Sequence, residues 1–213
     1  MSNKNKISKE KILELYSDYL LNHGNPPKNV QQFSKQSKFE EHEFYSFFSS
    51  FEHLERQMLV TLFNRSLELS KEFLNSKEMS VKEKLLNVYF IFFENLTLNR
   101  SLVLILIDNK FKNLSELRKV FVLFLDSLNF EEFEIFQQAS SKFKSFTNRS
   151  RNEFLWLHLL SCIDFWKKDQ SIAFESTDVY IEKSIDTGFD VIHSEPLKKV
   201  LDLGKFLWKE RFN

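Results

Sequence analysis

Apolar residues recur along most of this chain at intervals of three and four positions, and strict alternation of apolar and polar residues is rare. A period near 3.6 places such residues on one face of an α-helix, whereas a half-buried strand needs a period of two. The clearest stripe consists of Leu117, Val120, Phe121, Phe124, Leu125 and Leu128. The sequence therefore predicts an all-α protein, with helices near residues 8–23, 29–36, 40–47, 51–75, 80–94, 97–110, 114–128, 131–146, 150–168, 176–192 and 196–211.

Several helix boundaries carry specific signals. Ser80 and Glu83 have the spacing of a capping box, in which each side chain accepts a hydrogen bond from the backbone of the other residue. Pro26 and Pro27 separate the first two helices, because proline lacks a backbone N–H and resists continuing a helix. Pro196 is suited to the first turn of the last expected helix.

Composition excludes several classes of protein. With 30 basic and 30 acidic residues, the chain has no overall field that attracts nucleic acid or an anionic membrane. The one cysteine, Cys162, allows no intramolecular disulfide and no four-thiolate metal site, which favours a reducing compartment. The N-terminal segment lacks the apolar core of a signal peptide, and no apolar run is long enough to span a bilayer. We therefore expect a cytoplasmic protein.

Catalytic and cofactor motifs are absent from the sequence. Three scattered glycines cannot form a Rossmann fingerprint or a P-loop, both of which need glycines for close approach of the backbone to phosphate. The histidines and carboxylates of residues 40–43 and 52–53 are explained by solvated charge better than by a metal site. Cys162 lies in an apolar segment, where a thiol is unreactive. We expect a protein that is not an enzyme and holds no cofactor and no metal.

The N-terminal segment resembles the TetR family of regulators. Residues 12–24, ILELYSDYLLNHG, are similar to the first helix of that family, I-L-x-A-A-x-x-L-F-x-x-x-G. Residues 28–54, KNVQQFSKQSKFEEHEFYSFFSSFEHL, follow without a gap the family pattern T-x-x-x-x-I-A-x-x-A-G-V-S-x-G-T-L-Y-x-Y-F-x-S-K-x-x-L. The family's apolar or aromatic positions are filled by Phe33, Phe39, Phe44, Tyr45, Phe48 and Leu54.

This resemblance implies a TetR-like all-α fold with two domains. A small three-helix head with a helix-turn-helix would occupy residues 1–55, and a larger helical bundle for ligand binding and dimerisation would occupy residues 56–213. If the head binds DNA, the matching positions are Lys28, Lys38, Glu41, His42, Tyr45 and Ser46.

The departures from the family pattern fall on polar positions of the head. Lys38 stands at the turn glycine, Phe51 at a lysine, and Glu40, Glu41 and Glu43 lie where the family places donors to phosphate. Carboxylates can only accept hydrogen bonds, so three of them oppose phosphate binding, although one could accept from a cytosine amino group. Residues 1–56 carry eight basic and eight acidic side chains, so the usual basic surplus is missing. An alternative is that Glu40 and Glu41 only favour the dipole of the helix they begin. The sequence predicts a degenerate head with weak or non-standard DNA binding.

Residues 154–166, FLWLHLLSCIDFW, are apolar around almost the whole helix, which requires burial on two sides. Together with residues 179–192 they resemble the helix pair that forms the family's four-helix dimer interface. The interface residues expected from this resemblance are Trp156, Leu160, Ile163, Ile181 and Ile185. The alternative is a central core helix in a monomer.

Phenylalanine is unusually frequent, with 25 residues. We expect an apolar ligand site in the C-terminal part, lined by Phe90, Phe93, Phe121, Phe124 and the polar candidate His158. Ordinary packing in the core is the alternative for each of them.

Two functions are therefore open. The first is a TetR-like transcriptional regulator, a homodimer that binds an effector and has an atypical acidic recognition helix. The second is a TetR-derived carrier or accessory protein for a lipid or isoprenoid, which does not bind DNA. The last expected helix, residues 196–211, has an apolar stripe and five basic residues at positions 198, 199, 205, 209 and 211, so it could dock on the body or contact a membrane surface.

Overall fold

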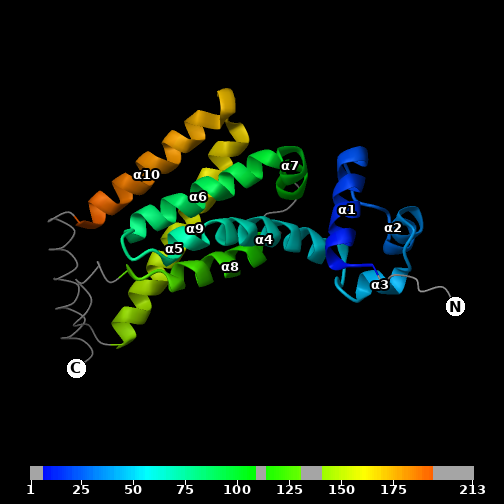
Figure 1. The fold of residues 1–213 in the computed structure, drawn as a ribbon, viewed down its shortest axis with the longest axis horizontal. Helices are drawn as coiled ribbons and strands as arrows, with labels where there is room; N and C mark the ends of the chain where they lie inside the picture. The colour runs from blue at the N-terminus through cyan, green and yellow to red at the C-terminus, as the bar shows by residue number, and fades with distance from the viewer. Residues whose placement is uncertain (1–6, 109–113, 131–140, 194–213) are drawn as a thin grey trace. The chain divides into compact units, whose positions relative to one another are not determined.

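The computed structural model describes residues 7–108, 114–130 and 141–193. All secondary structure in these ranges is helical, so the predicted all-α fold is confirmed (Figure 1). The expected helix 196–211 and the first part of 131–146 lie outside the described residues. The described α-helices are α1 (Lys9–His23), α2 (Val30–Ser37), α3 (Glu41–Tyr45), α4 (Phe51–Leu69), α5 (Lys71–Asn75), α6 (Val81–Leu98), α7 (Arg100–Asp108), α8 (Leu114–Ser127), α9 (Ser141–Lys168) and α10 (Glu175–His193).

The helix ends follow from local hydrogen bonds. The Ser8 hydroxyl accepts from the Lys11 N–H at 3.1 Å and begins α1, while Gly24 ends it in a left-handed conformation with φ 71°. The capping box predicted before α6 is confirmed, because the Ser80 N–H donates to Glu83 Oε2 at 2.8 Å and the Glu83 N–H donates to Ser80 Oγ at 3.3 Å. The Ser80 hydroxyl also donates to Glu83 Oε2, at 2.7 Å, and this bond together with that from the Ser80 N–H lowers the pKa of the Glu83 carboxyl.

Two helices differ from the expected ones. The segment predicted as one helix over residues 51–75 is divided at the buried Ser70 into α4 and α5. Conversely, α9 runs without a break through residues 147–149, where the sequence analysis separated two helices. The polar residues of that stretch include neither proline nor glycine, so nothing in it ends a helix.

The chain divides into two compact units. The first contains Met1–Glu68 and Phe92–Val120, and the second contains Leu69–Ile91 and Phe121–Asn213. Helices α1 to α4 and α7 thus belong to the first unit, whereas α5, α9 and α10 belong to the second. The domain boundary expected after residue 55 stays a prediction.

Aromatic side chains form the core of the first unit around Phe33 and Tyr16, which are fully buried. The Tyr16 ring stacks on Phe51 with ring centroids 5.2 Å apart and meets Phe33 edge-on at 5.6 Å. Its hydroxyl donates to Glu55 Oε1 at 2.8 Å, which ties α1 to α4. Burial and this carboxylate raise the pKa of Tyr16 well above its ordinary value.

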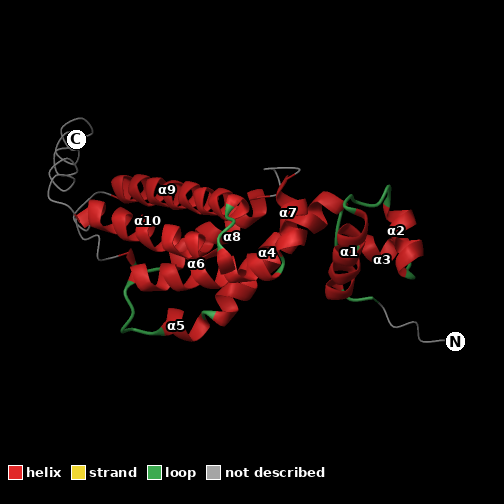
Figure 2. Ribbon diagram, turned by 90° about the horizontal axis from the view of Figure 1, so that it is seen from above, coloured by secondary structure: helices red, strands yellow, loops and turns green. Residues whose placement is uncertain are grey.

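In the second unit, α9 and α10 lie side by side and antiparallel (Figure 2). The turn between them is held by Asp169, whose carboxylate accepts from the backbone and hydroxyl of both Ser171 and Thr177 at 2.6–2.9 Å. Burial acts to raise the pKa of Asp169, but the hydrogen bonds from Thr177 and Ser171 outweigh it and lower the pKa to about 2.

No single helix in the described part of the chain is long and apolar enough to cross a membrane. The helices α6 and α7 reach the required length and apolarity only as a pair, and they meet at a bend of 95°.

Candidate functional site

The head contains a helix-turn-helix built from α2 and α3, which pack against each other (Figure 1). The turn depends on Lys38, which takes a left-handed conformation with φ 60° and ψ 41° at the position of the family's turn glycine. A residue with a Cβ atom in this conformation costs about 1 kcal/mol relative to glycine. The turn geometry is therefore preserved although its usual residue is not.

The helix α3 is oriented by Phe44, which is fully buried against Phe33, Phe48 and Phe51 at centroid distances of 5.4–6.5 Å. With Phe44 inside, the next residue on α3, Tyr45, points outward and is 54% exposed. Five of the six expected DNA-contact residues are exposed, namely Lys28, Lys38, His42, Tyr45 and Ser46. The sixth, Glu41, is partly buried.

The three carboxylates at the start of α3 are not equivalent. Glu40 and Glu43 form a capping box, in which the Glu40 N–H donates to Glu43 Oε2 at 3.0 Å. The other oxygen of Glu43, Oε1, accepts from the backbone N–H of Ile7 at 3.2 Å. The carboxylate of Glu43 is therefore turned toward backbone donors of its own domain, although it keeps its negative charge. The expectation that the three carboxylates oppose phosphate stays a prediction.

The lysine position filled by Phe51 also has a structural explanation. Phe51 is partly buried and packs on Tyr16, Phe33 and Phe44, so this position completes the aromatic core of the head. Lys9 lies at the start of α1, donates to Gln57 Oε1 at 3.4 Å and lies 5.8 Å from the centre of the Phe48 ring. Phe51 therefore contributes to core packing at a position where the family has a surface lysine.

A polar cluster lies inside the second unit around His158 of α9. His158 Nε2 is 2.8 Å from Ser184 Oγ on α10, and Nδ1 is 3.2 Å from the hydroxyl of Tyr89 on α6. The Ser184 hydroxyl donates to the Tyr180 carbonyl at 2.6 Å, so its oxygen accepts from His158. We therefore assign a proton of His158 to Nε2. The single hydroxyl proton of Tyr89 lies between two acceptors, the Leu155 carbonyl at 3.3 Å and His158 Nδ1.

Burial sets the protonation of this cluster. It lowers the pKa of His158 to about 4, so the ring is neutral near pH 7. It raises the pKa of Cys162, 3.7 Å from His158 Nε2, to about 12, so this thiol is not a nucleophile. Burial also raises the pKa of Tyr89. The cluster offers neutral hydrogen-bonding groups and no charge.

Aromatic residues extend the cluster along α8 and α9. The Phe121 ring lies 6.1 Å from both Tyr89 and Trp156, and 6.2 Å from Phe124. The structure thus brings together three of the expected ligand residues, Phe121, Phe124 and His158. Phe90 belongs to the same unit and is partly buried, whereas Phe93 belongs to the first unit, where it lies 5.9 Å from Phe92. Tyr89 and Ser184 were not expected from the sequence.

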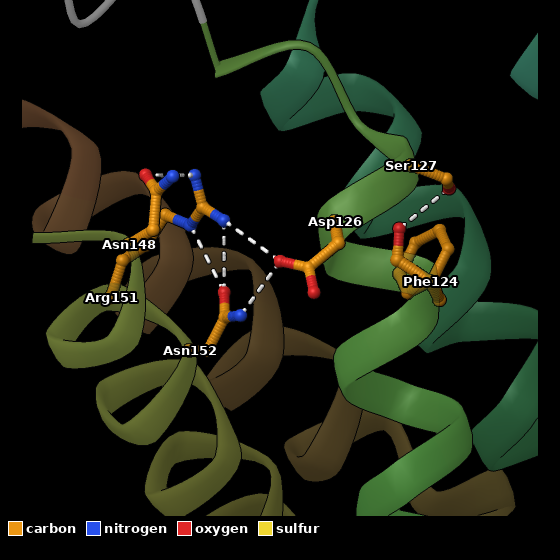
Figure 3. Close-up of polar contacts among 6 residues, drawn as sticks. All are labelled: Phe124, Asp126, Ser127, Asn148, Arg151 and Asn152. Carbon is orange, nitrogen blue, oxygen red and sulfur yellow. Dashed lines mark hydrogen bonds and ion pairs between the residues drawn. The ribbon is translucent and has the colours of Figure 1, made fainter. Parts of the chain in front are cut away.

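A second polar cluster joins the C-terminal end of α8 to α9 (Figure 3). The Arg151 guanidinium donates to Asn152 Oδ1 at 2.9 Å, lies 3.4 Å from Asp126 Oδ1, and covers the Phe130 ring at 4.1 Å. Asn152 in turn donates to Asp126 at 2.8 Å. Burial lowers the pKa of Arg151, and the Asp126 carboxylate opposes that effect. This cluster holds the two helices together beside Phe124.

The expected dimer residues are mostly inside the chain itself. Trp156, Ile163, Ile181 and Ile185 are buried, and Leu160 is partly buried. The exposed apolar residues of the same two helices are Phe154 (58% exposed), Leu157 (61%), Phe165 (37%) and Val179 (45%). Phe165 stacks on Tyr180 with a centroid distance of 4.5 Å, so these aromatic rings extend the exposed apolar face from α9 to α10.

Within residues 7–108, 114–130 and 141–193, no group of three or more His, Cys, Asp or Glu side chains could hold a metal ion.

Comparison with known proteins identifies the family. Residues 84–207, more than half of the chain, match the family model described as "Tetracyclin repressor-like, C-terminal domain". The solved structure of the fatty acid degradation regulator FadR from Bacillus halodurans has a similar fold, with a TM-score of 0.58 and 16% identity over 87% of this chain and 96% of that chain. No curated protein matches. Since the family model covers the body and the head has the helix-turn-helix described above, the chain belongs to the tetracycline repressor-like (TetR) family.

Proposed function

We propose that the protein is a transcriptional regulator whose head binds DNA through an atypical recognition surface. Members of this family are in general non-enzymatic homodimers that bind DNA and small molecules. The observation that carries the proposal is the hydrogen bonding of Glu43, whose carboxylate accepts from two backbone N–H groups of the head and is less free to oppose phosphate. Lys28, Lys38 and Tyr45 remain exposed for contact with phosphate or bases.

Binding should be weak at physiological salt. Glu40 is exposed and Phe51 supplies no cation, so fewer phosphates are neutralised than by a head with the usual lysine. Selection of genomic fragments in about 50 mM salt, where electrostatic binding is strongest, tests this part of the proposal.

A second copy of the chain is the proposed partner of the exposed apolar face on α9 and α10. Phe154, Leu157, Phe165 and Val179 give this face large side chains that water would otherwise cover. Removing them from water on dimerisation is favourable by about 25 cal/mol per Å². The buried Trp156 and Ile163 would support this surface from below.

The proposed effector is an elongated apolar molecule of the fatty-acyl, isoprenoid or quinone type. The aromatic residues Phe121, Phe124 and Trp156 favour an apolar partner, and the neutral His158 with Tyr89 offers hydrogen bonds to a polar but uncharged group. The fold of a fatty acid degradation regulator is in keeping with such a ligand. Native mass spectrometry of protein purified from its own host, followed by solvent extraction, tests for a bound lipid.

A carrier of lipid or isoprenoid without DNA binding is the second candidate. The observation that favours it is Phe51, since its packing in the aromatic core occupies a position where the family uses a lysine. The basic segment 196–211, outside the described residues, would then contact a membrane surface. Genomic selection that recovers no DNA, together with a co-purifying lipid, would support this function over the regulator.

A further inference from the structure

The imidazole ring of His53, in the first turn of α4, is oriented by the backbone that precedes this helix. Its Nδ1 atom lies 3.2 Å from the backbone nitrogen of Ser49, whose N–H donates to it, and 3.4 Å from the Ser49 hydroxyl. A backbone N–H can only donate, so Nδ1 is the acceptor and carries no proton. The single proton of the neutral imidazole is therefore on Nε2.

The Nε2 atom of His53 is accessible to solvent. Within the described part of the chain, the hydrogen bonds of this side chain are made by Nδ1 alone, and the buried side-chain atom that lacks a partner is Asn87 Oδ1. Since Nε2 has no partner among the described residues and is not buried, it presents an N–H donor to solvent. The phosphate oxygens of DNA accept hydrogen bonds from such side chains.

Lys9 of α1 brings a cation to the same region. The His53 ring lies 5.9 Å from the Phe48 ring between centroids, and the Lys9 ammonium lies 5.8 Å from the centroid of that ring. The ammonium also donates at 3.4 Å to Gln57, which lies one turn after His53 on the same face of α4. Two donors from separate helices, one neutral and one charged, therefore lie around Phe48, three residues after the end of α3.

We propose that His53 and Lys9 bind the phosphate backbone of DNA beside α3, with the Nε2–H group and the ammonium as their donors. The inference rests on the DNA-binding role proposed for the head. The family pattern leaves position 53 open and places its lysine at position 51, where this chain has the partly buried Phe51. His53 and Lys9 thus supply, from other positions, phosphate donors that the head lacks at Phe51.

The first test compares the full-length wild type with His53→Asn and His53→Gln on a DNA duplex of random sequence. Asparagine keeps an acceptor near the place of Nδ1 but has no donor at the place of Nε2, whereas the longer glutamine can put its amide donor there. Fluorescence anisotropy at about pH 8, where imidazole is neutral, should show about tenfold weaker binding by His53→Asn. His53→Gln should recover most of this loss, and urea titration checks that each variant is folded.

The second test is the salt dependence of binding. Loss of one charged phosphate contact per protomer should reduce the slope of log K against log salt by about 0.9 for Lys9→Ala. His53→Asn should keep the wild-type slope, because a neutral donor releases no counterion. The control His23→Ala removes an exposed imidazole at the end of α1 and should keep the wild-type affinity. The control Lys119→Ala removes an exposed ammonium group outside the head and should keep the wild-type slope.

NMR of the imidazole nitrogens in the DNA-free protein gives a readout that does not depend on binding. The His53 ring should show a protonated Nε2 and an unprotonated Nδ1, and the opposite tautomer would overturn the inference. Equal affinities of the wild type and His53→Asn would overturn it while leaving the proposed regulator function intact. Absence of binding by the wild type at about 30 mM salt, where electrostatic binding is strong, would overturn both.

Discussion

Glu43 holds the backbone N–H of Ile7 at 3.2 Å, although the two residues are 36 positions apart in the sequence. This contact shows that the acidic residues at positions 40–43 do not all have the same role. One of their carboxylates, that of Glu43, is a structural acceptor for two backbone N–H groups and keeps its negative charge. Part of the acidic composition of α3 therefore serves the local structure of the head.

The variants Glu41→Gln and Glu43→Gln should therefore have different effects. Removing the charge of Glu41 should strengthen DNA binding at low salt, since no described hydrogen bond depends on its carboxylate. Glu43→Gln should instead lower the free energy of unfolding by about 1 kcal/mol, because an amide has one acceptor oxygen for two backbone donors. Urea titration and anisotropy on the same preparations measure both effects. Equal stability of the two variants would contradict the structural role of Glu43.

Replacement of Lys38 by glycine should stabilise the head. Lys38 has φ 60°, a conformation that glycine adopts without a steric penalty, so Lys38→Gly should raise the free energy of unfolding by roughly 0.5–1 kcal/mol. The control Ser37→Gly, at the last helical residue of α2, should lower it. Chemical denaturation decides between the two signs, and a destabilised Lys38→Gly would show that the lysine side chain has another role at the turn.

Stability should fall as the pH decreases from about 6.5 to about 4. Burial lowers the pKa of His158 to about 4, so the unfolded chain takes up a proton in this range before the folded chain does. The loss is roughly 3 kcal/mol at most. Tyr89 and Cys162, the titratable neighbours, remain neutral throughout. His158→Gln should be less stable at pH 7 but should lack this part of the pH dependence. Parallel stability profiles for the wild type and the variant would contradict the assignment.

Leu157→Glu should dissociate the proposed dimer without unfolding the chain. Leu157 is 61% exposed, so a carboxylate at this position is hydrated in the monomer and loses its hydration only in an interface. Leu123→Glu, at a residue of α8 that is 68% exposed, is the control and should leave the dimer intact. Light scattering at micromolar concentration reports the mass. A dimer that survives Leu157→Glu places the interface elsewhere.

The sequence predicted the helices well because their boundaries depend on local chemistry. The expected helix 8–23 is observed as Lys9–His23 and the expected 80–94 begins at Val81, each after a capping serine. Contacts between residues that are distant in the sequence could not be predicted from such local signals. Tyr89 and Ser184 meet His158 over separations of 69 and 26 residues, and only the packing of α6, α9 and α10 brings them together.

Burial of the expected dimer residues could not be predicted from the sequence either, even for neighbouring positions on one helix. On a helix that is apolar on nearly all sides, periodicity alone does not distinguish the buried Trp156 from the exposed Leu157. That distinction follows from the neighbouring helices, which cover Trp156 with Phe121 and leave Leu157 open.

DNA binding by the head is the central claim, and the direct measurement is an anisotropy titration of selected genomic fragments in about 50 mM salt with the wild type and Tyr45→Ala. Tyr45 is 54% exposed on α3, so its removal should not unfold the head. We predict wild-type binding at micromolar or lower concentration that disappears by about 200 mM salt, with weaker binding by Tyr45→Ala. Absence of wild-type binding at 50 mM salt, from a protein that is folded and dimeric, would contradict the claim and leave the carrier function.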